Sequence, residues 1–143
     1  MALVYFDSSA LVKLLLDEAG SDIAAALWNG CDAALSSRLA YPEVCAALAA
    51  AVRNRTLTDS DAAAATSEWE VFWASIRPVE MSVDVGRTAG ALAARQQLGG
   101  ADAVHLASAL ALGSTDLTVA AWDKRLHAGA AAVGLAVAPA TLG

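Results

Sequence analysis

The chain has 143 residues, enough for one domain with a core that needs neither disulfides nor structural zinc. Its net charge of −6 argues against a protein that grips nucleic acid of any sequence through a basic surface. No apolar run reaches the ~20 residues of a membrane span, and the N-terminus lacks the basic region of a signal peptide. Cys31 and Cys45 show no metal-ligand spacing and are expected to be reduced thiols. We therefore expect a cytoplasmic chain with no membrane segment, forming a single domain over residues 1–143.

Apolar runs and helical periodicity alternate along the chain. Strands are predicted at 2–6, 33–36, 117–122 and 135–138, with a short edge strand within 76–81. Helices are predicted at 9–16, 22–29, 38–54, 59–75, 83–98, 101–112 and 124–132. The predicted caps, in chain order, are Ser8 or Ser9, then Ser21, then Thr58 or Asp59, then Ser82, and Ser37 is expected to open the helix at 38–54. This alternation predicts an α/β fold, in which about four or five short strands form a small parallel sheet covered on both faces by helices.

Four acids stand where the pattern changes from strand or loop to helix, namely Asp7, Glu43, Asp102 and Asp123. The apolar strand 2–6 runs directly into Asp7, and the apolar strand 117–122 runs into Asp123 in the same way. Ligands of open α/β sheets bind at the edge where strands end. Carboxylate oxygens are what Mg²⁺ prefers in proteins, so these acids are candidate metal ligands.

Helix capping is the alternative explanation for each acid. Asp and Glu are favoured at helix N-termini because they accept hydrogen bonds from free backbone N–H groups and complement the helix dipole. Glu43 and Asp102 lie in predicted first turns, where an acid needs no further reason. Asp7 and Asp123 are the stronger candidates because a strand delivers them, but the pattern alone leaves cap and ligand open.

Four other residues are candidates for supporting roles. Ser9 is expected to hydrogen-bond Asp7 or a metal-bound water, with a helix cap as the alternative. His105 is a candidate for contact with substrate, although a histidine at the margin of a core that makes one hydrogen bond is the commoner case. Lys13 and Arg38 are candidates for contact with substrate phosphates, and surface solvation is the alternative for both.

Taken together, four segments resemble the PIN-domain family, and within it the VapC-like toxins of bacterial toxin–antitoxin pairs. The matching segments are 7–13 (DSSALVK), 42–44 (PEV), 100–109 (GADAVHLASA) and 118–126 (TVAAWDKRL). The resemblance covers essentially the whole chain and implies a three-layer α/β/α arrangement. Trp122 is one departure, because the family more often has Phe or a smaller residue before the last acid.

The resemblance implies an endoribonuclease that depends on Mg²⁺, with Mn²⁺ as a substitute. Asp7 and Asp102 would bind the metal directly, and Glu43 and Asp123 would complete the catalytic pocket through water, with Ser9 supporting the site. Glu43 is the first choice to orient the attacking water. The resemblance also implies an RNA substrate, a cognate VapB-like antitoxin and a homodimer.

Three other functions are alternatives. An acid phosphatase-like hydrolase would use an Asp nucleophile after the first strand, but such sites have a second acid two residues later, where this chain has Ser9. A protein-interaction module would use Trp28, Trp69, Phe72 and Trp73 as its interface, although aromatic residues at helical spacing are more often core. A housekeeping nuclease of the same fold is the third.

Overall fold

One parallel sheet runs through the middle of the molecule, whose computed structural model describes residues 1–142. Its strands are β1 (Leu3–Phe6), β2 (Ala33–Ser37), β3 (Ile76–Val79), β4 (Leu117–Ala120) and β5 (Ala136–Ala138). They lie in the order β3-β2-β1-β4-β5, and every neighbouring pair is parallel. The chain therefore moves outward from β1 to β3 and returns to β4 on the other side of β1. The carboxyl ends of β1 and β4 flank the point where the order reverses, which is where ligands of such sheets bind.

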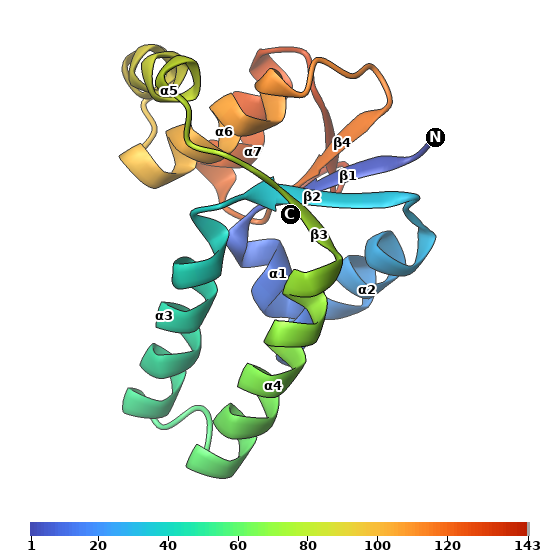
Figure 1. The fold of residues 1–143 in the computed structure, drawn as a ribbon, viewed down its shortest axis with the longest axis vertical. Helices are drawn as coiled ribbons and strands as arrows, with labels where there is room; N and C mark the ends of the chain where they lie inside the picture. The colour runs from blue at the N-terminus through green and yellow to red at the C-terminus, as the bar shows by residue number, and fades with distance from the viewer. Residues whose placement is uncertain (143) are drawn as a thin grey trace.

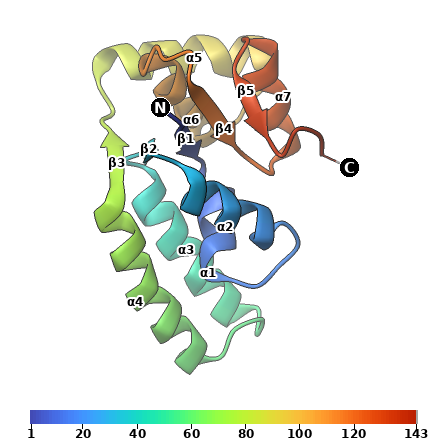
Figure 2. The ribbon, with the colours of Figure 1, turned by 90° about the vertical axis from the view of Figure 1, so that its right-hand side faces the viewer.

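Helices cover both faces of the sheet (Figures 1 and 2). One face carries α1 (Ser8–Leu15), α2 (Ser21–Gly30), α3 (Ala40–Arg53) and α4 (Asp59–Ser75). The other carries α5 (Val83–Gln96), α6 (Gly100–Ala111) and α7 (Lys124–Ala132). In both views α3 and α4 run side by side and extend well beyond the sheet. The expected three-layer α/β/α fold with a small parallel sheet is confirmed.

Strand β1 separates two hydrophobic cores. Val4 and Phe6 pack with α1, α3 and α4, whereas Tyr5 packs with α5 and α6 on the opposite face. This follows from the alternation of side chains along a strand. Asp7 continues the extended backbone, and it therefore follows Tyr5 toward the α6 side of the sheet. The strand thus determines the direction of its terminal acid.

Two of the four predicted caps are confirmed, and two are wrong. Thr58 and Ser82 cap α4 and α5, as predicted. The cap of α1 is Asp7 rather than Ser8 or Ser9, which both lie inside the first turn. The cap of α2 is Gly20.

Ser21 is not available as a cap because its hydroxyl has other partners. It donates to the Leu16 carbonyl and accepts from the Glu18 backbone N–H, which closes the turn between α1 and α2. Two boundaries also differ from the predictions. Ser37 belongs to β2, so α3 begins only at Ala40, and β4 ends at Ala120.

The aromatic residues of the helical layer are mostly core. Trp69 is fully buried, and Trp28, Phe72 and Trp73 are partly buried against the same cluster. Trp28 packs edge-on against Phe72 with ring centroids 4.9 Å apart. These contacts remove most of the surface that an aromatic interaction module would need. No helix within residues 1–142 is long and apolar enough to cross a membrane.

Gly20 allows Trp122 to pack closely against the turn after α1. A Cβ atom at Gly20 would lie 2.6 Å from the Trp122 indole nitrogen, and the backbone there has a φ of +92°. Both features require glycine. The large side chain before Asp123 is therefore accommodated by a glycine on a turn that is distant in sequence.

Gly20→Ala should destabilise the chain, whereas Gly90→Ala should stabilise it. The left-handed backbone alone costs about 1–2 kcal/mol for a residue with a Cβ atom, and displacement of Trp122 adds to this. Gly90 lies inside α5 with nothing within 4 Å of an added Cβ, so alanine there gains up to about 1 kcal/mol of helix propensity. Urea unfolding measures both changes. Equal free energies of unfolding for the two variants would contradict this account of Trp122.

Candidate metal-binding active site

Asp7 follows the last residue of β1 and is almost completely buried, with 3% of its surface exposed. As the N-cap of α1, its Oδ1 accepts hydrogen bonds from the Ala10 backbone N–H at 2.9 Å and from the Ser9 hydroxyl at 2.7 Å. Within residues 1–142, no hydrogen bond ends on its second oxygen, Oδ2. Capping therefore occupies one oxygen of this carboxylate and leaves the other for a further ligand.

The surroundings of Asp7 make its negative charge unfavourable. Burial raises the pKa of Asp7 to about 6, and the charge of Asp102 acts in the same direction. Hydrogen bonds from Ser9 and Ala10 and the proximity of His105 lower the pKa but do not cancel the effect of burial. A carboxylate in this position is stabilised either by a proton or by a nearby cation.

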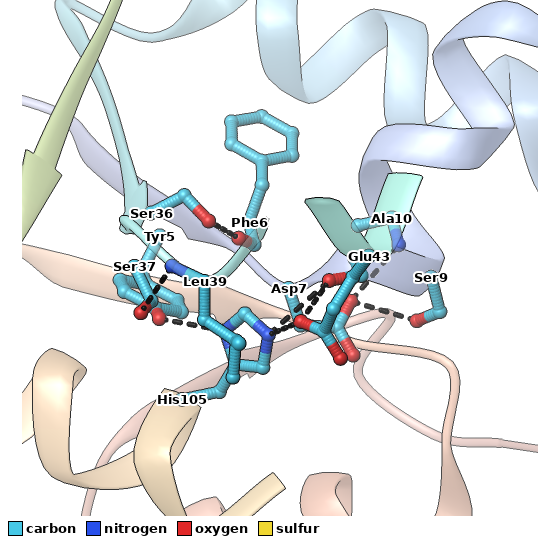
Figure 3. Close-up of polar contacts among 11 residues, drawn as sticks. Tyr5, Phe6, Asp7, Ser9, Ala10, Ser36, Ser37, Leu39, Glu43 and His105 are labelled. Carbon is cyan, nitrogen blue, oxygen red and sulfur yellow. Dashed lines mark hydrogen bonds and ion pairs between the residues drawn. The ribbon is translucent and has the colours of Figure 1, made fainter. Parts of the chain in front are cut away.

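Glu43 lies in the first turn of α3 and is half-buried. Its Oε1 accepts hydrogen bonds from the Ser8 hydroxyl and from His105 Nε2, both at 2.6 Å (Figure 3). Burial acts to raise the pKa of Glu43, but the hydrogen bonds from His105 and Ser8 outweigh it and the net pKa is lowered. Glu43 is therefore held in its ionised form. As with Asp7, no hydrogen bond within residues 1–142 ends on its other oxygen.

Asp102 and Asp123 occupy the starts of α6 and α7. Asp123 is the N-cap of α7, and its Oδ1 accepts from the Leu126 backbone N–H at 3.0 Å. Asp102 lies in the first turn of α6. Burial raises the pKa of Asp102, and the negative charges of Asp123 and Glu43 raise it further. The four acids thus form one electrostatically coupled group, contributed by four different helix starts.

The four carboxylates do not form a ready-made metal cage. Within residues 1–142, no three acidic, histidine or cysteine side chains already lie close enough together to hold a metal ion. Like charges repel one another at this edge of the sheet, and Glu43 is held by His105. The four side chains nevertheless suit a hard cation, which prefers carboxylate oxygens. In Asp7 and Asp123 a backbone N–H holds Oδ1, and Oδ2 is left for a metal ion.

Ser9 links two of the acids. Its hydroxyl donates to Asp7 Oδ1 and accepts from the Trp122 backbone N–H at 3.2 Å. Trp122 immediately precedes Asp123. The start of α1 is therefore tied to the segment that leads into α7, and Ser9 holds the Asp7 and Asp123 positions together.

The structure places the three expected substrate contacts differently. His105 is only 2% exposed and has both ring nitrogens engaged, which fits the core histidine given as the commoner case, except that it makes more than a single hydrogen bond. Lys13 pairs with Glu18 at 3.0 Å and lies over the Trp122 ring. Arg38 pairs with Glu80 on the surface and lies over the Trp73 ring. Both cations already have partners that a phosphate would have to displace.

Two residues that contact the site were not singled out from the sequence. Tyr5 reaches His105 from the buried strand, and Ser8 was expected only as a cap. Tyr5 could have been found from the sequence. It lies two positions before Asp7 in a strand, and side chains two positions apart point to the same face of the sheet. Ser8 has no such signal, since its contact with Glu43 joins residues 35 positions apart.

The family model described as PIN domain matches residues 4–131. The chain belongs to the PIN-domain family. Two curated relatives, "Ribonuclease VapC45" and "Ribonuclease VapC49" of Mycobacterium tuberculosis (strains CDC 1551 / Oshkosh and ATCC 25618 / H37Rv), are each 65% identical to it over 142 residues. Each alignment covers 99% of both chains, and the resemblance predicted from the sequence is confirmed.

A solved structure supports the fold of this PIN domain independently. The chain in "Toxin-antitoxin complex from Klebsiella pneumoniae" superimposes with a TM-score of 0.68 and covers 100% of both chains at 18% sequence identity. At that identity the likeness concerns the fold alone. It extends the PIN-like arrangement over the full length of the chain.

Asp7→Asn should remove part of the pH dependence of stability in metal-free buffer. The pKa of Asp7 is about 6 in the folded chain against 3.8 for an ordinary Asp, so the folded chain retains a proton that the unfolded chain releases between these values. The stabilisation by this proton is complete below about pH 4 and is lost as the pH rises through the folded pKa. The wild type should lose on the order of 2–3 kcal/mol relative to Asp7→Asn over this range, because each pKa unit corresponds to about 1.4 kcal/mol.

Urea unfolding in EDTA at a series of pH values measures this difference. Asp116→Asn is the matched control, because Asp116 is exposed and precedes β4, at the opposite end of the strand from Asp123. The control should keep the wild-type pH dependence. Parallel curves for wild type and Asp7→Asn would show that the Asp7 carboxylate is not destabilised by burial.

Proposed function

We propose that this chain is a Mg²⁺-dependent endoribonuclease and the toxin of a toxin–antitoxin pair, hydrolysing phosphodiester bonds of RNA. The observation that carries the proposal is the 65% identity, over nearly the full length, to two proteins named as VapC ribonucleases. The coupled acids at the switch point of the sheet supply a site of matching chemistry. The rival phosphatase reading is not supported, because Ser9 occupies the place of its second acid and is used to hold Asp7.

The roles of the acids follow from their surroundings. Asp7 and Asp102 have raised pKa values, so they gain most from a cation and are assigned as its direct ligands. Asp123 is assigned a contact through water. Glu43 has a lowered pKa and remains ionised, which suits a residue that orients the attacking water through a hydrogen bond. Ser9 keeps Asp7 in place through Oδ1.

When bound, Mg²⁺ or a substituting Mn²⁺ would polarise the phosphodiester, lower the pKa of the attacking water and stabilise the leaving oxygen. The chain's own contribution is the placement of four carboxylates around that position. Divalent charge also offsets the acids, so a net charge of −6 is compatible with an RNA substrate. Selection of the RNA then depends on the shape of a single-stranded or loop target and on local cations, among which Lys13 and Arg38 would exchange Glu18 and Glu80 for phosphate.

The same relationship suggests the partners. A related fold occurs in a chain described as part of a toxin–antitoxin complex, and we expect a cognate VapB-like antitoxin to silence this chain. We also expect a homodimer that acts in the cytoplasm, where its RNA substrates are. Co-expression with the product of the neighbouring reading frame is the direct way to identify the antitoxin.

Asp7→Asn and Asp102→Asn should each abolish Mg²⁺-dependent RNA cleavage while the fold survives. A residue that only supports a metal ligand typically contributes roughly 10–100-fold, so loss of a direct ligand should cost at least about 100-fold. Sequencing of total RNA after brief incubation with the purified chain detects cleavage and maps the target at the same time.

Asp116→Asn is again the control and should cleave like the wild type, since its side chain lies at the opposite end of the sheet. Circular dichroism would verify that all three variants are folded. Undiminished cleavage by both site variants would refute the assignment of the site. Absence of cleavage by the wild type at any Mg²⁺ concentration would refute the ribonuclease activity itself.

A further inference from the structure

Two buried side chains and one half-buried acid form a continuous hydrogen-bonded chain. The Tyr5 hydroxyl lies 2.7 Å from His105 Nδ1, and His105 Nε2 lies 2.6 Å from Glu43 Oε1. Tyr5 is 0% exposed, and its ring meets the imidazole edge-on with centroids 5.8 Å apart. Figure 3 shows the imidazole of His105 between Tyr5 and Glu43. The core of the protein thus reaches the active-site carboxylate through a single imidazole ring.

The Tyr5 hydroxyl determines which imidazole nitrogen carries the proton. Burial raises the pKa of Tyr5, so the hydroxyl keeps its proton and can donate it in a hydrogen bond to Nδ1. A neutral imidazole that accepts at Nδ1 carries its N–H at Nε2. That N–H faces Glu43 Oε1, which can only accept.

We propose that His105 is a positioning residue that holds Oε1 of Glu43 and thereby keeps Oε2 available to the acidic pocket, while Tyr5 selects its tautomer. Ser8 is a second donor to the same oxygen, so groups from α1 and α6 together fix a side chain of α3. His105 is buried, and among the four acids of residues 1–142 it hydrogen-bonds Glu43 alone. The inference rests on the proposed function, because it takes Glu43 as the residue that orients the attacking water.

Steady-state cleavage of an RNA oligonucleotide carrying the mapped site tests the proposal. His105→Leu should lower kcat by about 100-fold with KM nearly unchanged, and His105→Gln should recover about tenfold because its amide N–H can take the place of Nε2–H. Tyr5→Phe should lower kcat by about fivefold to tenfold in the wild type and have no effect in the His105→Gln background, because an amide has no tautomer to select.

Thr58→Ala is the control for lost stability. It removes the cap of α4, whose hydroxyl accepts from the Asp61 backbone N–H, without touching the Tyr5–His105–Glu43 chain. Its melting temperature should fall while kcat stays at the wild-type value. If His105→Leu does not fold, Tyr5→Phe and His105→Gln carry the kinetic test.

Nitrogen NMR of the imidazole provides a readout that does not depend on activity. The chain has two histidines, so a His127→Gln variant assigns the His105 signals. We expect the proton on Nε2 and none on Nδ1, and a proton on Nδ1 would overturn the proposal. Wild-type kcat for both Tyr5→Phe and His105→Gln, with Asp7→Asn inactive, would also overturn it. Cleavage that persists in Asp7→Asn would instead refute the proposed function, while the NMR result would still stand.

Discussion

Burying the Asp7 carboxylate at the end of β1 costs free energy, and its hydrogen bonds offset only part of that cost. The properties of the other residues of the site follow from this buried charge. The cost is visible as a pKa raised to about 6 despite two donors to Oδ1. The sheet topology imposes the position, because β1 is the central strand and its carboxyl end adjoins that of β4. Asp102 adds repulsion. The fold therefore places a carboxyl group where it is stable either when protonated or when its negative charge is balanced by a cation.

The acids differ because their neighbours differ. Glu43 receives hydrogen bonds from His105 and Ser8 and has a lowered pKa, whereas Asp7 and Asp102 have raised ones. Environments that push the pKa values of neighbouring carboxyls apart usually mark different chemical roles.

A carboxylate can cap a helix and bind a metal at the same time. Asp7 and Asp123 both cap a helix through Oδ1, and capping leaves the second oxygen free.

The sequence predicted local features well and long-range contacts poorly. The strand that ends on Asp7, the alternation of strands and helices and the four acids all follow from patterns within a few residues. The hydrogen-bond partners of the His105 imidazole could not be predicted, because they lie 100 and 62 positions away, beyond the reach of any periodicity. The Ser21 cap failed for a local reason instead, because the Leu16 carbonyl, five residues away, takes its hydroxyl. The spatial arrangement of the four acids is likewise set by the packing of separate helices, which spacing along the chain does not give.

The position of a bound metal tests the central claim most directly. Anomalous scattering from crystals grown with Mn²⁺ would locate the ion without reference to activity. We predict an ion bound by Oδ2 of Asp7 and by Asp102, with Oδ1 of Asp7 still accepting from the Ala10 backbone N–H. An ion bound away from Asp7, or an Asp7 side chain that abandons the α1 cap to bind it, would contradict the account.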